Sequence, residues 1–269
     1  MATVSLNDIH IGYDDAGSGE NALLLIHGHP FNRSMWHPQI AAVVDAGWRV
    51  VVPDLRGYGE TTVVPGKTTL DRFVADLVAV LDHLCVGRVV VGGLSMGGQI
   101  AMEFCRLHAE RVRGLMLAAT FPQAETDEGK RGRNAIADRL LREGMGAYAE
   151  EVLGKMVAPG SIAALPDVAQ HVLGVMRASD PVGAAAALRG RAERPPYINT
   201  LAALDVPALV VVGDQDAYTS RADADRMRDL LKRAELLWLE GVGHMPNLES
   251  TAAFNAALVR LLHDVAPAT

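Results

Sequence analysis

The stretch that decides the fold is Gly93-Leu94-Ser95-Met96-Gly97-Gly98. It directly follows a strand-like run at residues 88–91, and residues 97–108 have the apolar periodicity of a helix. A strand, the pattern G-x-S-x-G and a helix are typical of a nucleophile elbow, a sharp turn that lifts a serine hydroxyl into a cleft. The same turn leaves the backbone N–H of Met96 at the start of a helix, where it is suited to bind an oxyanion.

Outward from this turn, short runs of strand-forming residues alternate with longer helical patterns. The runs indicate strands that are buried on both faces, and they lie at residues 23–26, 49–52, 88–91, 115–118, 209–212 and 236–239. Helical periodicity occurs at residues 69–84, 97–108, 221–232 and 251–263. The alternation predicts an α/β protein with a mostly parallel, doubly wound sheet.

One long segment interrupts the alternation. Residues 121–206 contain no strand-like run, and glycines and prolines divide them into several short helices. We expect a helical cap over the carboxyl edge of the sheet, inserted between the strands near 115–118 and 209–212, with residues 1–120 and 207–269 as the core. The alternative is a set of ordinary crossover helices, which rarely need so many residues.

A serine hydroxyl is a poor nucleophile at neutral pH and needs a general base. In proteins with this elbow the chain order is Ser, then an acidic residue, then His. Asp214 and Asp216 follow the run at 209–212, and His244 follows the run at 236–239. Both loops come at the carboxyl ends of predicted strands, where α/β sheets place their sites. The expected nucleophile and base are therefore Ser95 and His244, with one of the two aspartates as the acid.

From the first predicted strand to the last, the chain resembles the α/β-hydrolase-fold serine hydrolases. The resemblance rests on the elbow, on the positions of acid and base, and on the loop Pro53-Asp54-Leu55-Arg56-Gly57-Tyr58-Gly59. It implies that Asp216 is the acid, because the acid of the family stands at the end of G-x-x-D, here residues 213–216. Asp214 is then a solvated or turn-capping carboxylate.

The loop His27-Gly28-His29-Pro30 also resembles the family. The resemblance implies that His29, the residue after His-Gly, supplies the second oxyanion N–H beside Met96, and that the bond before the proline is cis. His27, His29 and His37 have an alternative interpretation as metal ligands, but no Asp, Glu or Cys cluster completes such a set. We expect instead that His27 holds the loop by hydrogen bonds and that His29 lines the pocket.

A serine at the elbow favours acyl transfer through a tetrahedral oxyanion and an acyl-enzyme, with no metal or organic cofactor. Within the family, the sequence is similar to carboxylesterases and 3-oxoadipate enol-lactonase-like proteins, and to cofactor-free haloperoxidases or perhydrolases. We expect a small or medium apolar ester or lactone as substrate, in an apolar pocket lined by Pro30, Phe31, Met145 and Tyr148. Perhydrolase activity and a ligand sensor with slow turnover are the alternatives.

Composition excludes several other classes. Apolar residues make up 49% of the 269 residues, so the chain can bury a core and is not disordered. A net charge of −7 argues against binding to nucleic acid or anionic membranes, which needs clustered Lys and Arg. Two cysteines, Cys85 and Cys105, can form neither a disulfide framework nor a zinc site, and their helical patterns favour buried thiols. Because no signal peptide or membrane span is visible, we expect a cytoplasmic protein; its oligomeric state is left open.

Overall fold

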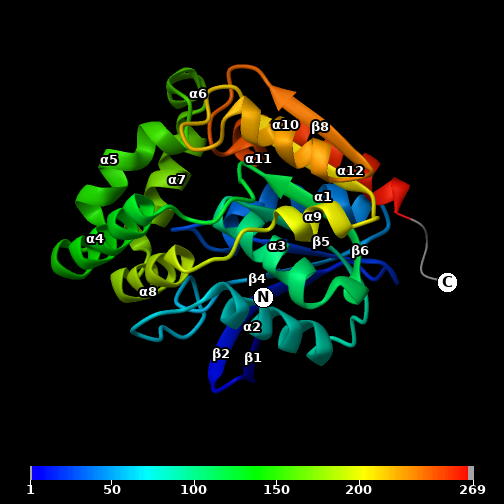
Figure 1. The fold of residues 1–269 in the computed structure, drawn as a ribbon, viewed down its shortest axis with the longest axis horizontal. Coiled ribbons are helices and arrows are strands. Elements are labelled where there is room, and N and C mark those ends of the chain that lie inside the picture. Colours follow the sequence, from blue (N-terminus) through cyan, green and yellow to red (C-terminus); the bar gives the residue numbers. More distant parts are fainter. Residues whose placement is uncertain (1, 266–269) are drawn as a thin grey trace.

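The computed structural model describes residues 2–265. Its eight strands are β1 (Ala2–Leu6), β2 (Ile9–Ala16), β3 (Ala22–Ile26), β4 (Arg49–Pro53), β5 (Val89–Leu94), β6 (Val112–Ala118), β7 (Ala208–Gly213) and β8 (Ala234–Leu239). They form one sheet in the order β1-β2-β4-β3-β5-β6-β7-β8 (Figure 1). β1 and β2 are antiparallel to their neighbours, and the other pairs are parallel. The predicted α/β fold with a mostly parallel sheet is confirmed.

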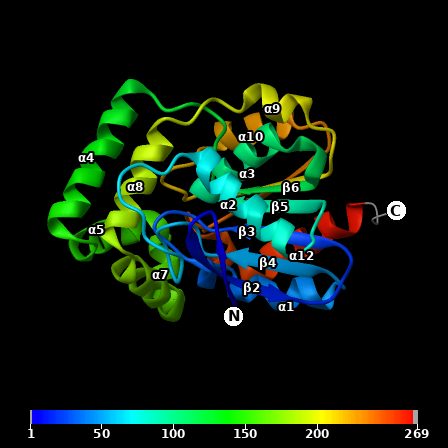
Figure 2. The ribbon, with the colours of Figure 1, turned by 90° about the horizontal axis from the view of Figure 1, so that it is seen from below.

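Helices cover both faces of this sheet (Figure 2). One face carries α1 (His37–Asp45) and α12 (Thr251–Asp264), and the other carries α2 (Leu70–His83), α3 (Met96–Leu107) and α10 (Arg221–Leu230). Each of them turns an apolar stripe to the sheet, as α2 does with Phe73, Val74 and Leu77. Short helical turns are η1 (Arg33–Trp36), η2 (Ala109–Arg111) and α11 (Pro246–Glu249). None of the helices within residues 2–265 is long and apolar enough to cross a membrane.

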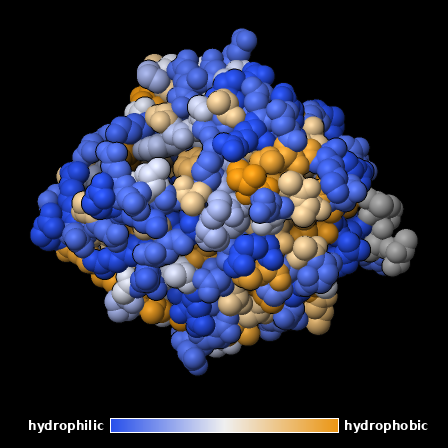
Figure 3. Space-filling model, in the orientation of Figure 1, coloured by the Kyte–Doolittle hydropathy of each residue, from blue (hydrophilic) through white to orange (hydrophobic). Residues whose placement is uncertain are grey.

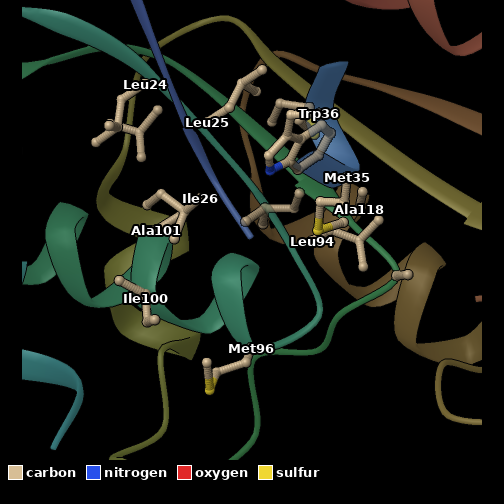
Figure 4. Packing of buried hydrophobic residues seen from close by; sticks show 14 of the residues in the cluster. Leu24, Leu25, Ile26, Met35, Trp36, Leu94, Met96, Ile100, Ala101 and Ala118 are labelled. Atoms are coloured by element: carbon tan, nitrogen blue, oxygen red, sulfur yellow. The ribbon is translucent and has the colours of Figure 1, made fainter. Parts of the chain in front are cut away.

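The strands beside the elbow are fully buried because both faces are covered. Every residue of β3 and β5 is buried, which explains their continuous apolar runs. Successive residues of a strand point to opposite faces. In Figure 4, Leu25 of β3 accordingly lies toward Trp36 of η1, whereas Ile26 lies toward Ala101 of α3. The elbow is thus supported by core packing from both sides.

Between β6 and β7 the chain forms the helices α4 (Asp127–Glu143), α5 (Gly146–Met156), α6 (Pro159–Ala164), α7 (Pro166–Ala178), α8 (Pro181–Ala192) and α9 (Ile198–Ala203). Proline stands at the start of α6, α7 and α8, where its missing N–H costs nothing. The helices α4 to α8, here called the helical segment, lie together beyond one end of the sheet, on the left in Figure 1. The division into core and cap at residues 121 and 206 stays a prediction.

Several elements differ from the sequence analysis. The helix α1 and the antiparallel strands β1 and β2 are additional to the predicted elements. β1 is largely exposed and β2 is only partly covered, so neither strand forms a continuous apolar run. β8 is an edge strand and is half-buried rather than buried on both faces. Cys85 is exposed in the turn after α2, with a φ of 56°, whereas Cys105 is buried as expected.

Candidate active site

Ser95 lies in the turn between β5 and α3. Its backbone angles, φ 56° and ψ −115°, are rarely adopted by residues other than glycine. The turn is held because Ser95 N donates to the Ala118 carbonyl (2.9 Å) and the Ser95 carbonyl accepts from Thr120 Oγ1 (2.8 Å). A Cβ on Gly97 would lie 2.1 Å from the Ile26 carbonyl oxygen, so α3 can approach β3 only with glycine at this position.

Two backbone N–H groups lie near Ser95. Met96 begins α3, so its N–H has no acceptor within the helix. His29 follows β3, the neighbour of β5, and a Cβ on the preceding Gly28 would lie 3.4 Å from Ser95 Cβ. The peptide bond between His29 and Pro30 is cis, as predicted. One N–H group is thus at the start of α3, directly after the serine, and the other is in the loop after β3.

His244 and Asp216 are joined in a buried pair. His244 Nδ1 lies 2.9 Å from Asp216 Oδ1 and 2.9 Å from Oδ2. The backbone N–H groups of Tyr218 (2.8 Å) and Thr219 (3.1 Å) also donate to Asp216 Oδ1. Burial alone would raise the pKa of Asp216, but His244 and the two N–H groups outweigh burial, and its pKa lies below the usual value. The ionised carboxylate thus holds the proton on Nδ1 and leaves Nε2 as an acceptor.

Asp214, the other candidate acid, is exposed. Its Oδ1 accepts a hydrogen bond from the backbone N–H of Gly241 at 2.7 Å. This bond joins the loop after β7 to the loop after β8. Asp214 therefore has a structural contact of its own, whereas Asp216 contacts the histidine.

Ser95 and His244 line one cavity of about 380 Å³, a size that suits a small or medium ligand. Tyr148 lines it too, and Tyr218 packs edge-on against His244 with 4.8 Å between the ring centroids. Ser95 Oγ and His244 Nε2 are not hydrogen-bonded in this structure; such contacts often tighten only with substrate. A larger hollow of about 780 Å³ at the amino ends of the strands contains none of these residues.

Three of the expected pocket residues do not line this cavity. Phe31 and Met145 are only 2% and 4% exposed and belong to the hydrophobic core. The carbonyl of Pro30 accepts a hydrogen bond from Ser179 Oγ at 2.7 Å, which joins the loop after β3 to the helical segment. Apolar residues next to a site are needed for packing as much as for lining, and sequence alone does not separate the two roles.

The lining of the cavity is mixed rather than apolar throughout. Apolar side chains contribute to it, namely Phe121, Ile136, Val152, Met156 and Leu188. Beside them lie four cationic side chains and one carboxylate: Arg133, Arg139, Lys155, Arg191 and Glu151. These charged side chains were not among the residues expected to line the pocket. No local signal marks Arg191, because Arg189 of the same Ala- and Gly-rich helix pairs with Asp138 at the surface, whereas Arg191 is buried.

His27 and His29 have separate roles. His27 Nε2 accepts from the Leu55 backbone N–H (2.9 Å), so its Nδ1 carries the proton and donates to the Gly28 carbonyl (2.9 Å). Burial lowers the pKa of His27. His29 lines the cavity, with Nδ1 2.8 Å from the Tyr58 hydroxyl. Over residues 2–265, no three His, Cys, Asp or Glu side chains are grouped to hold a metal ion.

The chain matches the alpha/beta hydrolase family over residues 23–257. It is 27% identical to 3-oxoadipate enol-lactonase 2 of Acinetobacter baylyi over 260 residues, which cover 95% of this chain and 94% of that protein. It is 26% identical to a putative non-heme chloroperoxidase of Synechocystis sp. over 277 residues, 94% of this chain and 95% of that protein.

Among solved structures, a malate-bound thermophilic esterase from Thermogutta terrifontis is similar with a TM-score of 0.94 and 34% identity, over 98% of both chains. These matches confirm the resemblance to esterases, enol-lactonases and haloperoxidases that the sequence indicated. Since the family match includes the elbow and the loops that hold Asp216 and His244, the chain belongs to the alpha/beta hydrolase family.

Proposed function

We propose that this protein is a serine hydrolase that cleaves a small or medium carboxylic ester or lactone through an acyl-enzyme. One observation carries the proposal: Ser95, in a strained turn at the carboxyl edge of the sheet, lines the same cavity as a histidine that the buried Asp216 orients. The similarity to an enol-lactonase and an esterase supports it.

In the first half of the reaction, Ser95 Oγ attacks the carbonyl carbon of the substrate while His244 Nε2 accepts the hydroxyl proton. Asp216 stabilises the imidazolium that forms, and it can do so because it remains ionised. The negative charge that develops on the carbonyl oxygen is bound by the backbone N–H groups of Met96 and His29. His244 then returns the proton to the leaving alkoxide, and Ser95 keeps the acyl group.

In the second half, a water molecule replaces the alcohol. His244 takes a proton from this water as it attacks the acyl carbonyl, and the same two N–H groups bind the second oxyanion. The ester bond to Ser95 breaks, its oxygen recovers the proton, and the carboxylic acid leaves. One ester and one water thus give one acid and one alcohol.

The test is hydrolysis of p-nitrophenyl acetate and butyrate, followed by aliphatic esters and lactones, with purified protein. Steady release of the alcohol product over many turnovers, abolished in Ser95→Ala, supports the proposal. A burst that stops after one equivalent contradicts it and favours a slow ligand sensor. Turnover that persists unchanged in Ser95→Ala contradicts the nucleophile assignment.

Perhydrolysis is a second candidate, and the similarity to a putative non-heme chloroperoxidase favours it. In that reaction hydrogen peroxide replaces water as the group that attacks the acyl-enzyme, and the product is a peracid. The assay adds hydrogen peroxide to the ester reaction and measures peracid by halide oxidation. Peracid formation that disappears in Ser95→Ala supports this activity, and its absence at every peroxide concentration rejects it.

A further inference from the structure

Arg191 is a buried cation at the wall of the catalytic cavity. The residue is only 9% exposed, and its Nε donates to Gln99 Oε1 at 2.6 Å. Within residues 2–265 its Nη nitrogens donate no hydrogen bond, and Arg191 is one of the residues that line the cavity. Buried charges in proteins are normally paired. Arg191 therefore has two Nη nitrogens without an acceptor, at the wall of the cavity that Ser95 also lines.

The nearby carboxylate does not neutralise Arg191. Glu125, whose charge favours the Arg191 cation, forms ion pairs with Arg133 and with Arg194. Within residues 2–265, no Asp or Glu forms an ion pair with Arg191. Burial, Arg133 and Arg194 all lower the pKa of Arg191, although a guanidinium stays protonated in proteins. The charged form is thus destabilised by its surroundings, and an anionic ligand would relieve this.

The position of Arg191 is fixed by close packing of α8. A Cβ on the preceding Gly190 would lie 1.6 Å from the Thr68 carbonyl oxygen, so α8 is in direct backbone contact with the loop before α2. On the other side, Gln99 lies one turn after Ser95 in α3, and its N–H donates to the Ser95 carbonyl (3.1 Å). The guanidinium is therefore tied to the helix that carries the nucleophile, which gives it a defined place relative to the reacting carbonyl.

The charged side chains of this wall carry an excess of positive charge. Arg133 pairs with Glu125, and Arg139 pairs with Glu143 and Glu151. Within residues 2–265, Lys155 and Arg191 form no ion pair, and both line the cavity. This excess of positive charge contrasts with the net charge of −7 of the whole chain. The outer surface over α4 and α5, on the left in Figure 3, is mostly hydrophilic. Clefts lined by one sign of charge raise the local concentration of ligands of the opposite sign.

We propose that Arg191 binds a carboxylate of the substrate, so that the protein acts on esters or lactones that carry a free carboxylate besides the carbonyl attacked by Ser95. The inference rests on the proposed function, since it names the substrate class of the same site. A guanidinium holds a carboxylate by two parallel hydrogen bonds, which orients the molecule as well as binding it. The bound carboxylate is unchanged in the reaction: a half-ester and water give a dicarboxylate, an alcohol and a proton.

The test compares esters that differ only in one charged group. Monoethyl succinate, glutarate and adipate are matched with ethyl butanoate, pentanoate and hexanoate, in which a methyl group replaces the carboxylate. Because the carboxylate can lie on the alcohol side instead, 4-acetoxybutanoate is matched with butyl acetate. Acid release at constant pH measures kcat/KM. For at least one pair, we expect the anionic ester to be preferred by about tenfold or more.

Three variants locate the cause of that preference. Arg191→Met should reduce the ratio of kcat/KM between anionic and neutral ester to near one. Arg191→Lys keeps the positive charge but not the planar guanidinium, so it should retain part of the preference. Arg189→Met is the matched control: Arg189 lies two residues away on α8 and pairs with Asp138 on the surface, so the preference should persist. Circular dichroism and thermal unfolding establish that each variant is folded.

A binding measurement separates this inference from the proposed function. Calorimetry with glutarate and adipate on Ser95→Ala should show binding that Arg191→Met, introduced into the same background, abolishes. If no ester is hydrolysed but this binding is found, the proposed function fails and the carboxylate site stands. If neutral esters are hydrolysed as well as every anionic partner, or if Arg191→Met keeps both preference and binding, the carboxylate site is wrong and the hydrolase stands.

Discussion

His244 Nδ1 lies 2.9 Å from each carboxylate oxygen of Asp216, whose side chain has no exposed surface. The pair joins the loops that follow β7 and β8, so it depends on the register of two parallel strands rather than on a local motif. It fixes the orientation and the tautomer of the imidazole. Its proximity to Ser95 in one cavity is the basis of the proposed reaction.

Asp216→Asn should reduce kcat by about 10³–10⁴-fold, because a neutral amide neither fixes the tautomer of His244 nor stabilises its cation. The matched control is Asp214→Asn. An asparagine oxygen still accepts from the Gly241 N–H, so this variant should stay near wild type. Steady-state ester hydrolysis measures both. Equal losses in the two variants would contradict the choice of Asp216.

The rate should depend on pH through one group. Only a neutral imidazole can accept the serine proton, so kcat/KM should rise with pH to a plateau. Asp216 adds no second step, because its pKa lies below the usual value and it is already ionised. His29 adds none either, because burial and neighbouring arginines hold its pKa well below the usual value. A pH-rate profile that is flat from about pH 5 to 9 would contradict a histidine base.

Gly97→Ala should destabilise the protein by about 1–3 kcal/mol and abolish turnover, because the new Cβ would overlap the Ile26 carbonyl and displace the elbow. Gly154→Ala is the matched control. Gly154 lies in α5 with nothing within 4 Å of an added Cβ, so alanine should stabilise the protein by about 0.5–1 kcal/mol. Thermal unfolding measures both effects. A fully active, equally stable Gly97→Ala would show that the elbow tolerates a side chain.

Acid should weaken the contact between Glu125 and two arginines. Burial alone would raise the pKa of Glu125, but the hydrogen bond from Arg194 and the charge of Arg133 outweigh it and lower the pKa to about 2. A carboxyl whose pKa is lowered by folding stabilises the protein above its unfolded pKa, and this stability is lost as the pH falls toward the folded pKa. The difference in Tm between wild type and Glu125→Gln should therefore be full above about pH 5 and shrink between about pH 4.5 and 2. A difference that is constant over this range would show that folding does not lower the pKa of Glu125.

The sequence predicted the strands that are buried on both faces and the turn that carries Ser95. Strands covered on both faces form continuous apolar runs, and Ser95 lies in a local motif that a strand and a helix define. β1 and β2 were not predicted, because each has an exposed face or end and therefore lacks the continuous apolar run that marks a buried strand. The places of Asp216 and His244 followed from topology, because the loops at the carboxyl ends of parallel strands meet at one edge.

The charge of the cavity could not be predicted in this way. Arg191 reaches it only because α8 packs closely, with Gly183 against Gly57 and Gly190 against Thr68. These contacts join segments far apart in the chain, and no local pattern records them. Met145 and Phe31 show the opposite error. Both are apolar and were expected to line the pocket, but they pack in the hydrophobic core.

The central claim is that Ser95 carries the acyl group during turnover. It is tested most directly by treating the protein with a p-nitrophenyl phosphonate ester, which mimics the tetrahedral intermediate, and locating the adduct by peptide mass spectrometry. The account predicts one phosphonyl group per chain, on Ser95, with loss of ester hydrolysis in proportion to labelling and no adduct in Ser95→Ala. An adduct on another residue, or complete inactivation with Ser95 unmodified, would contradict it.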